Sequence, residues 1–191
     1  MIKNIISDLW CQVINKALLN HSNYSSEKTL VFHFAWLLKN TLNDEIAIID
    51  FEKCKEMHGN SYEMDHTYNF YIALSHLQLN EFAKAEEIFN TDILEQIEQK
   101  GEAHHLDLFY YGISLYEQKK WEQAIEEFDK AISQYENFSD AKVYKAFCLG
   151  RIGQEKRAND LLLEAKADAK NGYTINEDNM IHEVYPYKVK W

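Results

Sequence analysis

The sequence predicts an all-α fold built from repeated pairs of helices. Its 191 residues include only six Gly and one Pro, which is typical of a helical protein and disfavours a β-rich or loop-rich fold. Small and large apolar residues recur four positions apart, the spacing of neighbours on one helix face. The whole pattern then returns at a period close to that of helical solenoids.

The pattern is clearest near the middle of the chain. Gly112 is a position at which two antiparallel helices can cross closely, because close approach requires a small residue on one of them. Trp121 starts the next expected helix, whose packing face is formed by Ala124, Phe128 and Ala131. We therefore expect Ala124 and Ala131 to be buried where the two helices meet.

The same arrangement recurs on both sides of this pair. One step toward the C-terminus leads to Ala146, Ala158, Leu162 and Ala165, with Gly153 in the expected turn. One step toward the N-terminus leads to Ala73, Phe82, Ala85 and Phe89, and a further step leads to Ala35, Ala47 and Phe51. The step from Ala73 to Gly112 is longer than the step from Gly112 to Ala146. Its additional length falls in the polar run 95–102, where we expect a longer second helix.

The elements are expected in the following order. Residues 1–22 read as an amphipathic N-terminal capping helix, followed by a polar break. Helix pairs are expected at 27–40 with 44–57, 64–79 with 82–99, 103–118 with 121–134, and 139–151 with 155–170. The helix pairs correspond to repeats near 28–60, 66–100, 105–138 and 139–170. Together with the capping helix they are expected to form a single domain at 1–172, whose last helix ends at Gly172 as a left-handed C-cap. Residues 173–191 lack a helical period and are rich in Tyr, Ile and Val. We expect this tail to pack on the solenoid, over the final helix or in its groove.

Residues 107–131 resemble part of a tetratricopeptide repeat, a helix–turn–helix unit with a length of about 34 residues. The resemblance extends from about Lys28 to Lys170, although Glu136 stands where such a repeat usually has proline. It implies a right-handed α-solenoid of about four helix pairs that works by binding another protein, without catalysis.

In this family the first helix of each pair lines a concave groove. The resemblance assigns to that groove Phe32, Trp36, Phe70, Leu74, Phe109, Ile113, Val143 and Phe147, with Tyr110, Tyr116 and Tyr144 near it. The Lys and Asn residues with which some members grip a C-terminal carboxylate are replaced here by apolar residues, so no carboxylate clamp is expected. An apolar or aromatic segment of a partner would suit this groove. Alternatively, these side chains are ordinary core, covered by the chain's own tail or by tighter packing.

The net charge of −11 is unevenly distributed. Between Glu81 and Asp140 the chain has fifteen acidic residues and five Lys, a net charge of −10. The helix surface there is expected to carry Glu86, Glu87, Glu122, Glu126 and Glu127. These residues either keep the outer helices soluble or attract a basic protein. Both interpretations disfavour nucleic acid, whose phosphates would be repelled.

Other classes of site lack their sequence signatures. Cys11, Cys54 and Cys148 form no close pair and are expected to be reduced core residues of a cytoplasmic protein. We see no signal-peptide pattern and no apolar run of the roughly 20 residues that a membrane span needs. The pair His104-His105, considered with His66 and His76, suits a metal poorly, because adjacent helical residues point about 100° apart. Asp50 and Glu52 lie two apart, on different helix faces, and no phosphate loop or catalytic signature is present. We expect no cofactor, no metal and no enzyme.

Two functions stay open at this point. The segments Gly-Tyr-Thr-Ile-Asn-Glu-Asp-Asn and Tyr-Pro-Tyr-Lys-Val resemble the tails of small acidic bacterial repeat proteins that act as toxin immunity proteins. This resemblance implies that the acidic surface binds and neutralises a basic toxin domain. The alternative is a general scaffold or assembly adaptor that holds an apolar peptide in its groove.

Overall fold

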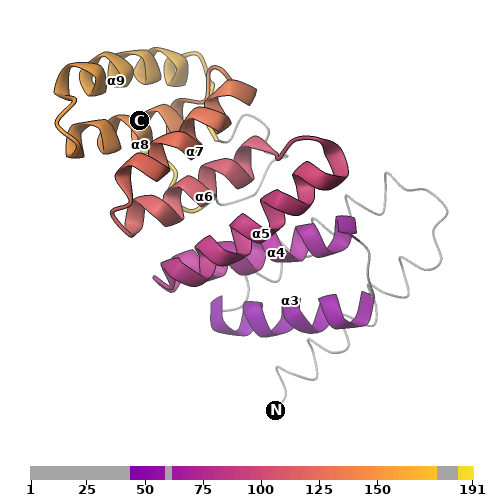
Figure 1. The fold of residues 1–191 in the computed structure, drawn as a ribbon. Coiled ribbons are helices and arrows are strands. Elements are labelled where there is room, and N and C mark those ends of the chain that lie inside the picture. The colour runs from indigo at the N-terminus through magenta and orange to yellow at the C-terminus, as the bar shows by residue number, and fades with distance from the viewer. Residues whose placement is uncertain (1–43, 59–61, 176–184) are drawn as a thin grey trace. The chain divides into compact units, whose positions relative to one another are not determined.

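The computed structural model describes residues 44–58, 62–175 and 185–191. These residues form seven helices, labelled α3 to α9 in Figure 1, and no strand, which confirms the all-α prediction. The chain divides into two compact units, 1–79 and 80–191, and each is described by itself. The expected helices at 1–22 and 27–40 lie outside the described residues, so the division into a capped single domain stays a prediction.

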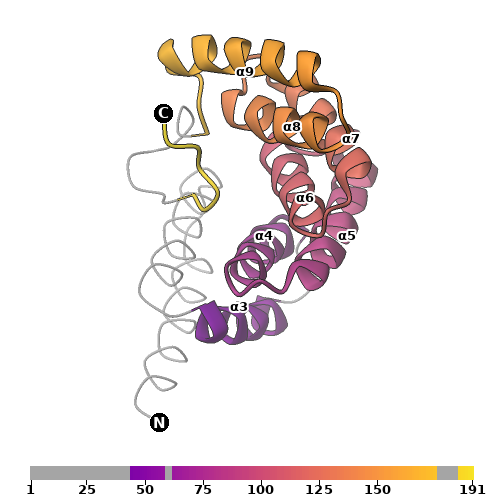
Figure 2. The same cartoon turned by 90° about the vertical axis from the view of Figure 1, so that its left-hand side faces the viewer.

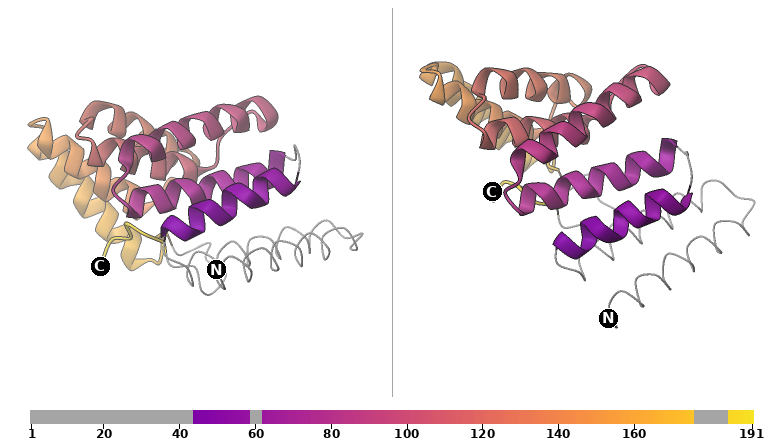
Figure 3. Two further views of the ribbon diagram at one scale, coloured as in Figure 1. Left: turned by 90° about the horizontal axis from the view of Figure 1, so that it is seen from below. Right: turned by 60° about the horizontal axis from the view of Figure 1, so that its bottom comes forward.

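The first unit contains the helices α3 (Asp44–His58) and α4 (Tyr62–Gln78), which lie side by side (Figure 3). Their contact is aromatic: the ring of Phe51 stacks on that of Tyr71, with centroids 5.8 Å apart. Ala47 and Phe51 are fully buried, as the small–large pattern predicts. Lys55 Nζ donates a hydrogen bond of 2.7 Å to Asn69 Oδ1 and links the two helices at their polar edge.

The second unit contains five helices and the C-terminal segment. The helices are α5 (Phe82–Lys100), α6 (His105–Glu117), α7 (Trp121–Gln134), α8 (Ser139–Arg151) and α9 (Glu155–Lys170). Each one packs against the next in sequence (Figure 2). The predicted bounds of these helices agree closely with the observed ones.

The crossing of α6 and α7 has the predicted geometry. Phe128 on α7 is fully buried, and its ring lies against the backbone of Gly112 on α6. A Cβ atom at Gly112 would lie 2.6 Å from Phe128 Cε1, well inside van der Waals contact. Ala124 and Ala131 are also fully buried, which confirms the expected packing face of α7.

The left-handed turns of unit 2 recur along the sequence at the same spacing as the helix pairs. Asn80, Lys119 and Gly153 all have left-handed φ values, of 60°, 63° and 80°. The step from Asn80 to Lys119 is the longer one and the step from Lys119 to Gly153 the shorter one, as the sequence predicts. The longer step is taken up by α5, which has 19 residues where α7 has 14. Gly101 ends α5 with φ 85°, and its N–H donates to the carbonyl of Ile97.

Gly172 follows α9 with φ 96°, in agreement with its expected role. Of the helices in the described part of the chain, none is long and apolar enough to cross a membrane.

Candidate interaction surface on unit 2

The C-terminal segment, residues 185–191, lies along α6 and α8 (Figure 2). Tyr110 on α6 donates its hydroxyl to the backbone carbonyl of Pro186 at 3.0 Å. Tyr144 on α8 donates its hydroxyl to the carbonyl of Tyr187 at 2.9 Å. Both tyrosines therefore hold the backbone of the segment at the turn of Pro186 and Tyr187, and the ring of Tyr110 also lies 6.4 Å from that of Tyr185.

Asp140, in the first turn of α8, holds the chain at two further points. Its fully buried carboxylate accepts from the backbone N–H of Val189 at 2.8 Å through Oδ1, and from that of Ile175 at 2.9 Å through Oδ2. The N–H of Ser139 donates to the carbonyl of Tyr173 at 3.2 Å beside them. One carboxylate thus fixes both the start of the C-terminal region and its final segment.

Three of the residues assigned to the groove lie in the core of unit 2. Phe109, Ile113 and Val143 are buried. The ring of Phe109 contacts those of Phe138 and Tyr144 on its neighbouring elements, with centroids 5.0 and 5.8 Å apart. These side chains are packed between helices, and the hydroxyls of Tyr110 and Tyr144 beside them are bonded to the C-terminal segment.

Two other assigned residues, Tyr116 and Phe147, line an open cavity of about 460 Å³. The cavity is formed by the end of α6 and by α8 and α9, through Tyr116, Ala146, Phe147, Gly150, Arg151, Glu155, Ala158, Asn159 and Leu162. Phe147 is 45% exposed. Tyr144 connects the cavity to the C-terminal segment, because its ring lies 5.4 Å from that of Tyr116 and 6.0 Å from that of Phe147.

The remaining assigned groove residues belong to unit 1 or to the part of the chain outside the description. Phe70 and Leu74 lie on α4 and are buried, and the ring of Phe70 meets that of Tyr71 edge-on at 5.5 Å. Phe32 and Trp36 lie outside the described residues. The structure therefore brings Tyr116 and Phe147 together at an accessible place and leaves the full groove a prediction.

The five acidic residues fall into two sets. Glu87, Glu122 and Glu126 are exposed on α5 and α7. Glu86 forms an ion pair of 2.6 Å with Lys120, and buried Glu127 forms one of 2.7 Å with Lys130. Because the last two carboxylates are neutralised locally, an approaching cation would be attracted mainly by the first three.

Burial also sets the protonation of the groups near this surface. It raises the pKa of Tyr144, and it raises the pKa of Tyr187 to about 12, with smaller contributions from nearby acidic groups. The Tyr144 hydroxyl, which like any tyrosine is protonated at neutral pH, donates to the segment. Burial likewise raises the pKa of Cys148 to about 12, so this cysteine stays a thiol and is a poor nucleophile.

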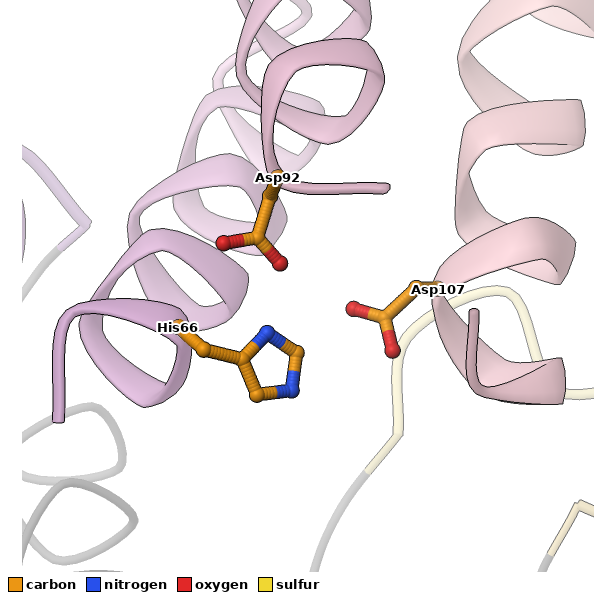
Figure 4. Close-up of side chains that lie close together, drawn as sticks. All are labelled: His66, Asp92 and Asp107. Atoms are coloured by element: carbon orange, nitrogen blue, oxygen red, sulfur yellow. The ribbon is translucent and has the colours of Figure 1, made fainter. Parts of the chain in front are cut away.

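Polar side chains link α5 and α6 next to the turn between them. Figure 4 shows the carboxylates of Asp92 on α5 and Asp107 on α6, whose oxygens come within 4.8 Å of each other. Gln96 donates to Asp92 at 3.1 Å and accepts from the N–H of His104 at 3.0 Å. His104 caps α6 by accepting from the N–H of Leu106. Gln96 and His104 thus have structural roles in joining the two helices; His66, also labelled there, belongs to unit 1.

Sequence reasoning missed Asp140 and Lys142. An acidic residue in the first turn of a helix is common and stabilises the helix dipole, so nothing set Asp140 apart. Lys142 is buried, and it binds Glu164 and Asp168 of α9, the latter at 2.6 Å. Burial alone would lower its pKa, but the hydrogen bonds to these carboxylates outweigh burial and raise the pKa.

Comparison with known proteins supports the repeat. Residues 105–138 match the model of the tetratricopeptide repeat. This stretch is the α6–α7 pair with its following turn, the same unit that the sequence pattern singled out.

Solved structures of MamA are similar in fold. A MamA RS-1 ArsTM double mutant has a TM-score of 0.63 and 12% identity, over 90% of this chain and 89% of that one. MamA from residue 41 to the end, from Desulfovibrio magneticus RS-1, has a TM-score of 0.62 and 13% identity, over 89% and 94%. MamA MSR-1 C2 has a TM-score of 0.60 and 12% identity, over 90% and 99%. At these identities the likeness shows the fold alone. No curated protein matches the chain in sequence.

Proposed function

We propose that this chain acts without catalysis, by binding another protein. The repeat at 105–138 supports this proposal, because stacked helix pairs of this kind form extended surfaces for protein binding. The accessible aromatic residues Tyr116 and Phe147 beside an open cavity add a place where a partner side chain fits.

More specifically, we propose that the protein is an acidic, cytoplasmic immunity protein that neutralises a basic toxin domain. The observation that carries this proposal is the exposed acidic set on α5 and α7, Glu87, Glu122 and Glu126. Like-signed carboxylates on one unit attract a basic partner over several ångströms and accelerate its association. Bound there, the helices would cover the toxin's active site.

The test begins with affinity purification from the native cell and mass spectrometry, together with a search for a toxin gene directly upstream. The association rate of the recovered partner is then measured at increasing salt. We expect the rate to fall steeply with salt and to be lower for Glu87→Gln/Glu122→Gln/Glu126→Gln, with dissociation nearly unchanged.

A matched control removes the same charge from α3, at the exposed residues Glu45, Glu52 and Glu56. This triple Gln variant should associate like the unchanged protein. If the two triple variants behave alike, or if association ignores salt, charge steering by α5 and α7 is wrong.

The alternative is a scaffold or assembly adaptor that binds an apolar peptide. The cavity lined by Tyr116 and Phe147 favours it, because it offers an open aromatic recess for an apolar side chain. Phe147→Ala would then weaken the partner complex, whereas the acidic triple variant would leave its dissociation constant unchanged.

A further inference from the structure

Helix α5 exposes two large aliphatic side chains near its C-terminal end. Leu94 is 59% exposed and Ile97 is 47% exposed. They lie three residues apart and are therefore neighbours on the helix surface. The buried face of α5, which includes Ala85 and Phe89, points the other way. The exposed pair thus lies outside the packing of unit 2.

The repeat shows that the fold does not require an aliphatic residue at this place. Phe89 of α5 corresponds to Phe128 of α7. In the same register Leu94 corresponds to Ser133 of α7 and, one repeat further, to Ala167 of α9, both of which are exposed. Small residues therefore suffice where the second helix of a pair faces water. Leu94, together with Ile97, provides apolar area that is open to a contact.

Carboxylates lie on both sides of this apolar pair along the helix. Glu87 comes seven residues before Leu94 and Glu98 comes four residues after it, and both intervals return to the same helix face. Both side chains are exposed, and among the described residues neither carboxylate forms an ion pair. The two lysines of α5, Lys84 and Lys100, lie outside this line. The outer face of α5, which we define by Glu87, Leu94, Ile97 and Glu98, therefore presents apolar area between two uncompensated negative charges.

This face is separate from the surface that holds the C-terminal segment. Figure 2 shows α5 and α7 on the side of unit 2 that is turned away from residues 185–191. Glu122 and Glu126 are exposed on α7, so the negative charge extends beyond α5. A partner on the outer face of α5 would leave the C-terminal segment in place.

The charges decide which partner fits. A second copy of the chain has a net charge of −11 and would be repelled, as would nucleic acid and anionic lipid. A basic helix gains twice on this face: its aliphatic side chains bury apolar area, and its Lys or Arg side chains meet carboxylates one and two turns away. Helices with apolar residues on one face are a common form of partner segment.

We propose that the outer face of α5 is the docking surface for a basic amphipathic helix of the partner protein. Aliphatic side chains of that helix pack on Leu94 and Ile97, and its Lys or Arg side chains contact Glu87 and Glu98. The proposal rests on the proposed function and deepens it, because it names the contact and the chemistry of the partner. The carboxylates accelerate association, and the apolar pair slows dissociation.

The probe is a synthetic alanine-based peptide of about 20 residues, long enough to form a helix in water. It carries two leucines three residues apart, with lysines one and two turns to either side. Isotope-labelled full-length protein is titrated with it and followed by NMR. We expect the amide signals of α5 around Leu94 to shift, and Leu94→Ser/Ile97→Ser to weaken binding about tenfold. Leu163→Ser is the matched control, because Leu163 on α9 is 70% exposed, and it should leave the dissociation constant unchanged.

A second pair of variants tests the charges. Glu87→Gln/Glu98→Gln should weaken peptide binding about threefold at low salt, and the difference should disappear at high salt. Glu136→Gln/Asp160→Asn removes the same charge at exposed positions elsewhere in unit 2 and should have a smaller effect. A peptide with alanines in place of the leucines should bind about as weakly to the unchanged protein as the original peptide binds to Leu94→Ser/Ile97→Ser.

Several results overturn the proposal. They are an absence of peptide binding, signal shifts confined to other helices, and equal effects of Leu163→Ser and Leu94→Ser/Ile97→Ser. Self-association in sedimentation that Leu94→Ser/Ile97→Ser abolishes also overturns it, because the face would then join two copies of the chain.

These outcomes are distinguishable from a failure of the proposed function. A native partner that binds Leu94→Ser/Ile97→Ser as tightly as the unchanged protein would uphold that function and overturn this site. A peptide that binds as expected would uphold the site even if no native partner is recovered.

Discussion

Replacing Gly112 by Ala tests the central helix crossing most directly. The new Cβ atom would lie 2.6 Å from Phe128 Cε1 and 2.8 Å from Cδ1, whereas ordinary contacts are 3.4 Å or longer. The ring cannot move aside easily, because Phe128 is fully buried with Phe109 and Tyr144 at centroid distances of 6.0 and 6.1 Å. The crossing must therefore open or the ring must leave its preferred rotamer.

Two opposing effects set the size of the change. Overpacking a core of this kind destabilises by about 1–3 kcal/mol, and this geometry falls in the upper part of that range. Ala is better than Gly in a helix interior by about 1 kcal/mol. We therefore expect Gly112→Ala to lower the free energy of unfolding by about 1–2 kcal/mol. For a unit of this size the melting temperature should fall by about 4–8 °C.

Gly150 on α8 provides a matched control. A Cβ atom there meets nothing within 4 Å, so Gly150→Ala should keep only the helical benefit and stabilise by about 0.5–1 kcal/mol. Thermal and urea unfolding of both variants measure the difference. A Gly112→Ala variant that melts at or above Gly150→Ala would refute the steric argument. A double-mutant cycle with Phe128→Leu should also show coupling between the two positions.

Three further predictions concern buried and half-buried groups of unit 2. Lys142→Met leaves Asp168 and the 58% exposed Glu164 without their cation. It should lower the free energy of unfolding by about 1–3 kcal/mol, which is less than the loss of a partner costs in a fully buried ion pair. An unchanged urea midpoint would contradict this. In a variant with the other two cysteines replaced by Ser, Cys148 should react with a thiol reagent only after the protein unfolds, because burial raises its pKa to about 12. Rapid labelling of the native variant would show that the thiol is accessible. Burial also raises the pKa of Glu117, so the folded state binds its proton more tightly than the unfolded chain and ionisation costs stability. Glu117→Gln should therefore raise the melting temperature at pH 7, with a benefit that disappears as the pH falls below the ordinary glutamate range, and a benefit independent of pH would point to another cause.

The helices could be predicted from the sequence because their signals are local. Ala124 and Phe128 lie four positions apart on one face, and the left-handed turns at Lys119 and Gly153 keep the step of the repeat. Tertiary roles were harder to predict. Phe109 occupies a position that the repeat assigns to a groove, yet neighbouring aromatic rings enclose it here.

The anchoring of the C-terminal segment could not be derived for a related reason. The tail was expected over the final helix or in the groove, and nothing in the sequence chose between them. The choice depends on Asp140, whose two oxygens bind the backbone amides of Ile175 and Val189, far along the chain. Backbone groups are the same at every residue, so the sequence carries no sign of such a partner.

The position of this segment also has a consequence for the order of folding. The helices of unit 2 contact their neighbours in the chain, and contacts of that kind close short loops and form quickly. The bonds from Tyr110 to Pro186 and from Tyr144 to Tyr187 instead join residues 76 and 43 apart, and together they need α6 and α8 already in place. The segment should therefore dock last, after the helices have assembled. A terminal segment that docks last can also detach by itself, so local opening would expose Tyr110 and Tyr144 while the helices beneath remain folded.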